Sequence, residues 1–181
     1  MFTGVNLAPL SHQLLWVSYV GNVQRGTIMH PILSKIFTFE NRLVMLGWLV
    51  LICLPSWEVG KLIVVGIILT ISATYAFLLA FGSRFDLDAR PPSFRLFGSL
   101  KGVMALFKNP RVSLTAWLHF LAFDLLIGLL ILNDSQQLGI YHWFMAPILV
   151  LSMMIGPAGL LIYLCLRLLY AQSFFGFFIG Q

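Results

Sequence analysis

A carboxylate in the middle of an apolar run is the most chemically informative feature of this sequence. Asp124 lies within the stretch HFLAFDLL, inside the third of four apolar runs. An ionised side chain at the centre of a bilayer costs about 2.5–3.5 kcal/mol even on lenient scales, so such residues usually face the protein interior and often carry function. We therefore interpret Asp124 as a candidate general acid or base in a dry pocket. The alternative is a structural acid bonded to a neighbouring helix.

His119 is the second ionisable residue of the same run. It stands five positions before Asp124, a spacing that places it about 140° around a helix from that carboxylate. The two side chains cannot meet along one helical stripe, so a joint role needs a wide cavity or contacts with different helices. His119 is a candidate partner in acid–base chemistry, and a satisfied packing histidine is the alternative.

Small and aromatic residues near Asp124 could contact a ligand. Trp117 and Gly128 fall on the same helical face as Asp124, within about 40°. The fourth apolar run carries Gly156 and Gly159 near its middle, and the proline between them predicts a kink. Small residues permit close approach by a ligand or by another helix. We predict Trp117, Gly128, Gly156 and Gly159 as ligand-binding residues, with tight helix packing as the alternative.

Composition identifies the solvent around these residues. Hydrophobic residues make up 60% of the 181 residues and charged residues only 9%, whereas a soluble domain is about a quarter charged. So few charges cannot cover a water-facing surface, and we expect an all-α integral membrane protein in contact with membrane lipid. The net charge of +5 comes from basic residues between the apolar runs, which argues against nucleic acid as a partner.

The apolar runs predict a bundle of four transmembrane helices. The expected spans cover about residues 39–56, 61–81, 112–132 and 143–169. The first is short unless Glu40 lies at the membrane interface. They form one membrane domain over residues 39–170, preceded by an N-terminal interfacial segment over 1–38 and followed by a C-terminal tail over 171–181.

The long loop between the second and third spans carries an amphipathic pattern. Leu100, Val103, Met104 and Phe107 follow helical spacing, which predicts a helix lying on the membrane surface. It is either a structural anchor for the third span or a substrate gate. Basic residues gather in this loop, in the N-terminal stretch and at the start of the tail, so the positive-inside rule places the loop and both termini in the cytoplasm.

Motifs of soluble enzymes are missing from the sequence. It contains no phosphate loop, dinucleotide fingerprint, zinc spacing or haem-attachment motif, and its four histidines stand in separate segments. We therefore expect neither a metal nor another cofactor.

Several segments resemble the neoxanthin-synthase-like membrane family, named after an abscisic-acid-deficient plant mutant. They are SLKGVMALF at 99–107, HFLAFDL at 119–125 and GPAGLL at 156–161, and the resemblance extends over about residues 39–169. It implies a four-span protein of photosynthetic membranes. The lack of a plastid transit peptide at the N-terminus indicates a cyanobacterial member, in the thylakoid or plasma membrane.

The resemblance also implies a chemistry. Plant members are needed to turn the epoxide violaxanthin into the allenic xanthophyll neoxanthin, without a known metal or redox cofactor. An acid would protonate the epoxide oxygen and a base would remove a proton to form the allene; Asp124 and His119 are our candidates for these roles. The expected function is thus a cofactor-independent carotenoid isomerase. The alternative is a non-catalytic pigment-binding or assembly subunit with photosynthetic or carotenoid-biosynthetic protein partners.

Overall fold

The computed structural model describes residues 30–86 and 94–171. Within these ranges every regular element is helical, so the expected all-α architecture is confirmed. The tail over 172–181 and most of the N-terminal interfacial segment lie outside the described residues, while residues 31–38 form the first turns of a long helix.

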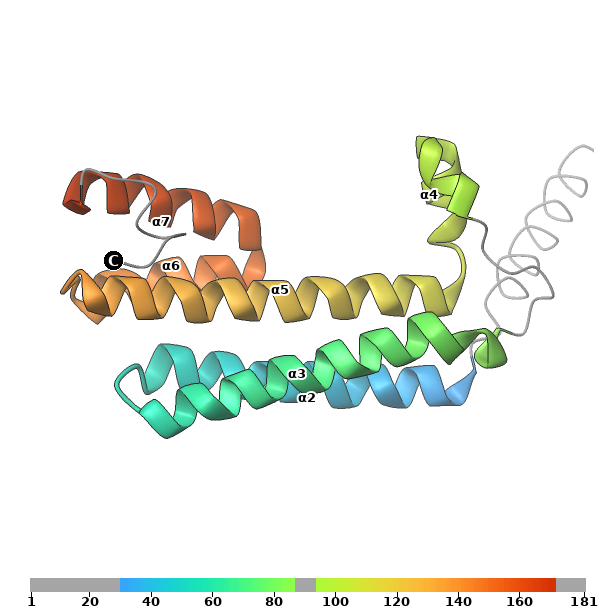
Figure 1. Ribbon diagram of the computed structural model, residues 1–181, viewed down its shortest axis with the longest axis horizontal. Helices are drawn as coiled ribbons and strands as arrows, with labels where there is room; N and C mark the ends of the chain where they lie inside the picture. Colours follow the sequence, from blue (N-terminus) through green and yellow to red (C-terminus); the bar gives the residue numbers. More distant parts are fainter. Residues whose placement is uncertain (1–29, 87–93, 172–181) are drawn as a thin grey trace, which may run out of the picture.

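Three long apolar helices form the body of the protein (Figure 1). They are α2 (Pro31–Cys53), α3 (Glu58–Phe81) and α5 (Pro110–Gln137), and each is long and apolar enough to cross a membrane. All three pack along one another, which agrees with the first three predicted spans.

Local sequence signals set where two of these helices begin. Both α2 and α5 start with a proline, whose missing amide is harmless at that position. The preceding residues cap them: the ring of His30 accepts from the amide of Ile32, and Asn109 Oδ1 accepts from the amides of Arg111 and Val112. These caps fix the starts of α2 and α5 at one end of the bundle.

The predicted fourth span is not one helix. Residues 143–169 fall into α6 (His142–Met154) and α7 (Gly156–Ala171), which are separated at Ile155 and pack against each other. The break has a local cause, because Pro157 cannot donate an amide and Ile155 has a non-helical backbone. With 13 and 16 residues, each helix is shorter than the roughly 20 residues that a crossing needs.

The α6–α7 hairpin turns back halfway along α5. At its tip, Gly156 lies against Asp124, near the middle of α5. At its base, Arg167 of α7 donates to Asp134 near the end of α5, with Nε 2.7 Å from Oδ2, and His142 Nε2 donates to the carbonyl oxygen of Ile52 over 2.7 Å. The hairpin therefore enters and leaves at the same end of the bundle, and Figure 1 shows it alongside one half of α5.

This arrangement also bears on the predicted sidedness. Ala171 lies at the end of the bundle that holds the α2–α3 turn, whereas His30 lies at the opposite end, where its ring contacts Phe85. The two ends of the described chain thus lie at opposite ends of the bundle. The expectation that both termini share one side rested on a fourth full crossing, which the hairpin replaces.

A short helix lies where the amphipathic pattern predicts one. It is α4 (Leu100–Leu106), which follows the 3-10 turn η2 (Phe94–Gly98) and is capped by Ser99 Oγ, an acceptor for the amide of Gly102. Leu100 and Met104 are exposed, whereas Leu106 is buried. Its position on the membrane surface stays a prediction.

Candidate functional site

Asp124 lies at the tip of the α6–α7 hairpin. A methyl group on Gly156 would overlap its Oδ1 atom, so the carboxylate touches the backbone where α7 begins. The side chain is half-buried, and among the described residues no hydrogen bond or ion pair joins it to another side chain. Because α7 begins at Gly156, the carboxyl group lies at the helix end whose backbone amides carry a partial positive charge.

His119 lies in different surroundings. Its ring packs on Phe123 of the same helix, with ring centroids 4.5 Å apart, and faces Tyr75 of α3 at 5.8 Å. Asp124 faces the hairpin and His119 faces α3, so the two side chains do not meet. This agrees with the separation that their spacing indicates.

A cavity of about 400 Å³ opens beside His119, between α3, α4 and α5. Its apolar walls come from all these helices and from η2: Leu79, Phe97, Leu106, Phe107 and Phe120. Its polar lining comes from α3, from the residues after it and from α5: Tyr75, Ser83, Arg111, Thr115 and His119. A mostly apolar cavity of this size with a few polar groups is typical of a small-molecule site.

The charge of Arg111 is already neutralised within the protein. Its Nη2 atom lies 2.9 Å from Asp86 Oδ2, its Nε donates to the same carboxylate, and its Nη1 donates to the carbonyl oxygen of Leu78. Asn109 Nδ2 also donates to Asp86 over 3.2 Å. This buried network ties the end of α3 to the start of α5, beside the cavity that Arg111 helps to line.

Two other polar groups of the cavity remain available to a ligand. Among the described residues, neither the hydroxyl of Tyr75 nor the ring nitrogens of His119 have a protein hydrogen-bond partner. Thr115, by contrast, donates to the carbonyl oxygen of Arg111 over 2.8 Å. The pair of Tyr75 and His119 can therefore bind and polarise an oxygen, or exchange a proton with a ligand.

Two of the predicted ligand-binding residues pack against α2. The indole Nε1 of Trp117 donates to Asn41 Oδ1 over 3.2 Å. Gly128 accommodates the ring of Trp48, since a methyl group there would lie 2.5 Å from that ring. Neither residue lines the cavity beside His119.

The other two form the inside of the hairpin. Gly156 receives the carboxylate of Asp124, and Gly159 lies against both the hydroxyl and the backbone of Ser152. Their small size lets α6 and α7 approach each other and α5, which is the packing role weighed for them above. Neither contributes to the wall of the cavity.

Sequence reasoning missed Tyr75 and misplaced Glu40. Tyr75 stands in an apolar run with no local signal, and only the packing of α3 on α5 brings it to His119. Glu40, which was considered only as a residue of the membrane interface that would lengthen the first span, has just 2% of its surface exposed. It shares the buried face of α2 with Leu33 and Gly47, at multiples of seven residues, and this register was visible in the sequence.

Three membrane-length helices, a half-length hairpin and a mostly apolar cavity are the features of a helical membrane protein. The chain belongs to the ABA DEFICIENT 4-like family, whose sequence model matches residues 35–163. This range includes the cavity, Asp124 and most of the hairpin, and it confirms the resemblance noted in the sequence. The family is linked in general to xanthophyll and neoxanthin biosynthesis. No curated protein and no solved structure matches the chain.

Proposed function

We propose that this protein binds one ring end of an epoxy-carotenoid in the cavity beside His119 and isomerises the epoxide to an allenic alcohol. The observation that carries the proposal is the pair of His119 and Tyr75. Their rings lie side by side, with centroids 5.8 Å apart, in the lining of an apolar cavity, and neither has a protein hydrogen-bond partner among the described residues. It acts in the thylakoid or plasma membrane of a cyanobacterium, where its substrate dissolves.

The size of the cavity suits the end of a long pigment. At about 400 Å³ it falls within the roughly 300–1,000 Å³ of ligand pockets, and it can hold a cyclohexane ring with the start of a polyene. The remaining chain would follow the exposed side of α5, where Phe120 and Phe123 are each 54% exposed. Aromatic faces provide a large apolar contact for a conjugated chain.

The proposed reaction is an isomerisation in which every atom is retained. The hydroxyl of Tyr75 donates a proton to the epoxide oxygen as one C–O bond breaks, and the oxygen remains on its other carbon as a hydroxyl group. Neutral His119 removes the proton from the neighbouring vinylic carbon, and that electron pair forms the second double bond of the allene. His119 then returns its proton to Tyr75, so no oxidant or reductant is consumed.

The proposal assigns Asp124 a different role from the one predicted. Because its carboxylate lies against Gly156 and outside the cavity, Asp124 acts as a positioning residue for the hairpin tip. The second acid–base role passes to Tyr75, which shares the cavity with His119.

Pigment conversion in a carotenoid-producing host tests the proposal. The host makes violaxanthin, and extracted pigments are separated by chromatography with and without the protein. We expect the wild type to form an allenic product and His119→Ala to lower the rate by about 100-fold or more, as for loss of an acid–base group. Tyr75→Phe should also lower it, while Asp124→Asn should keep most of it. Full activity in both His119→Ala and Tyr75→Phe would contradict the site.

A pigment-binding subunit without catalysis is the second candidate. The observation that favours it is the exposed aromatic side of α5, where Trp117 is 43% exposed beside Phe120 and Phe123. In the same experiment, every epoxy-carotenoid is supplied in turn. Carotenoid that purifies with the protein but is chemically unchanged in each case would support this function over the isomerase.

A further inference from the structure

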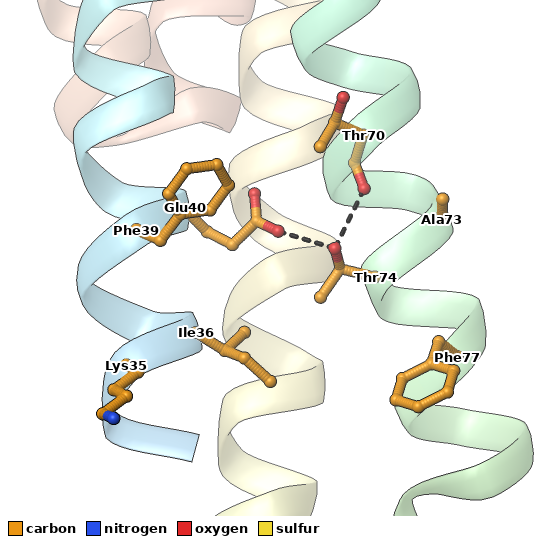
Figure 2. A pocket seen from close by; sticks show the side chains of 8 residues that line it. All are labelled: Lys35, Ile36, Phe39, Glu40, Thr70, Ala73, Thr74 and Phe77. Atoms are coloured by element: carbon orange, nitrogen blue, oxygen red, sulfur yellow. Dashed lines mark hydrogen bonds between the residues drawn. The ribbon is translucent and has the colours of Figure 1, made fainter. Parts of the chain in front are cut away.

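A groove of about 550 Å³ lies between α2 and α3, on the other side of α3 from the cavity of His119. Figure 2 shows its polar floor, formed by Glu40, Thr70 and Thr74, between the apolar side chains of Phe39 and Phe77. Because Thr74 and Tyr75 are neighbours in α3, their side chains leave the helix in different directions. The groove is therefore separate from the proposed catalytic cavity.

The floor of the groove contains an acceptor without a donor. Glu40 Oε1 accepts from the hydroxyl of Thr74 over 2.6 Å, whereas Oε2 is buried and has no hydrogen-bond partner among the described residues. Thr74 cannot serve both oxygens, since its hydroxyl has a single proton and its Oγ1 atom also lies 3.1 Å from the carbonyl oxygen of Thr70. Buried acceptors nearly always have a donor, so Glu40 Oε2 indicates a partner that is not among the described residues.

The depth of Glu40 restricts what that partner can be. Glu40 lies nine residues after Pro31, about 14 Å along α2, in a membrane whose apolar core is about 30 Å thick. Headgroup amines stay at the surface, so an apolar molecule that carries its own donor suits this depth. Lys35 lines the rim of the groove, but among the described residues it forms no ion pair with Glu40.

We propose that this groove binds the hydroxyl group of a membrane-soluble alcohol. The hydroxyl donates to Glu40 Oε2, and the apolar body of the ligand lies along Phe39 and Phe77. A hydroxylated carotenoid and a long-chain lipid alcohol share this chemistry, and a competition experiment distinguishes them.

Photolabelling of the purified protein in lipid nanodiscs tests the site. The probes are a long-chain alcohol that carries a diazirine near its hydroxyl and the matching alkane without the hydroxyl, and mass spectrometry locates the label. We expect the alcohol to label α2 and α3 around the groove about fivefold more than the alkane, the contribution of one hydrogen bond. Equal labelling by the two probes would overturn the proposal.

Variants show whether the preference depends on the buried carboxylate. Glu40→Leu should abolish the preference for the alcohol, and Glu58→Leu, which removes an exposed carboxylate, should leave it unchanged. If Glu40→Leu does not fold, the two probes are compared on the wild type and on Glu40→Gln instead. Glutamine keeps a neutral acceptor, so the alcohol should label Glu40→Gln less than it labels the wild type. His119→Ala should not alter labelling, so this site and the proposed catalysis can fail independently.

Competition identifies the source of the alcohol. Unlabelled hydroxylated carotenoid that displaces the probe, while the hydrocarbon carotene does not, would assign the groove to a pigment. Displacement by a saturated long-chain alcohol alone would assign it to a lipid. If none of these displaces the probe, the labelling is non-specific and the proposal is wrong.

Discussion

Substitution of Gly159 tests whether the last apolar run is a hairpin or a single span. In the hairpin, a methyl group at this position would lie 2.5 Å from the backbone nitrogen of Ser152 and 2.6 Å from its Cα. Backbone atoms cannot turn aside, so the cost lies at the upper end of the roughly 1–3 kcal/mol for overpacking. Alanine gains about 1 kcal/mol over glycine in a helix, which leaves a net loss of about 2 kcal/mol for Gly159→Ala.

Gly66 provides a matched control for this measurement. It lies in α3, and a methyl group there meets nothing within 4 Å. Gly66→Ala should therefore stabilise the protein by up to about 1 kcal/mol. Reversible unfolding of both variants in mixed micelles, followed by circular dichroism, gives the two changes in free energy of unfolding.

A continuous fourth span would give a different result. In a straight helix, residues 152 and 159 stand about 10 Å apart along the axis, and Gly159→Ala would then stabilise the protein as Gly66→Ala does. Equal stabilisation by both substitutions would refute the hairpin. Single cysteines at Gln137 and Tyr170, with Cys53 and Cys165 replaced, give an independent check, since the hairpin requires labelling from the same side of the membrane.

Two further predictions concern contacts of α5. Arg167→Leu should lower the free energy of unfolding by about 3–5 kcal/mol, because it leaves the buried carboxylate of Asp134 without its cation, although the hydroxyl of Tyr163 still donates to it. The double variant with Asp134→Leu should recover part of this loss, and additive losses would contradict the pairing. Gly128→Ala should cost about 1–3 kcal/mol by overpacking against Trp48, and Trp48→Phe should relieve it in the same unfolding assay. No relief would mean that these two residues are not in contact.

The three long helices could be predicted because each is encoded in a continuous apolar run. Hydropathy could not distinguish a kinked span from a hairpin over residues 143–169, since both bury the same side chains. The Gly156-Pro157 pair marked the break, but the direction of the chain after it depends on the contacts of Gly159 with Ser152 and of Arg167 with Asp134. These contacts are tertiary and leave no local pattern.

The residues of the candidate site likewise divide into those that could be predicted from the sequence and those that depend on tertiary packing. His119 could be identified as a polar residue within a span, and its rotation away from Asp124 follows from their spacing. Its partner Tyr75 could not, because a tyrosine in an apolar run resembles many lipid-facing aromatics until α3 is placed beside α5. Glu40 was identifiable from its register with the buried face of α2, and the assumption that charged residues mark the ends of a span concealed it.

The half-length hairpin makes the two halves of the bundle unequal for any ligand. It covers α5 from Asp124 onward, whereas the cavity of His119 and the groove of Glu40 both lie in the other half of the bundle, on the side of α4. Under the proposed function, a pigment with an epoxide at each end would present only one end per binding event. It would have to leave and turn over before the second could react, and a product altered at one end alone would accumulate first.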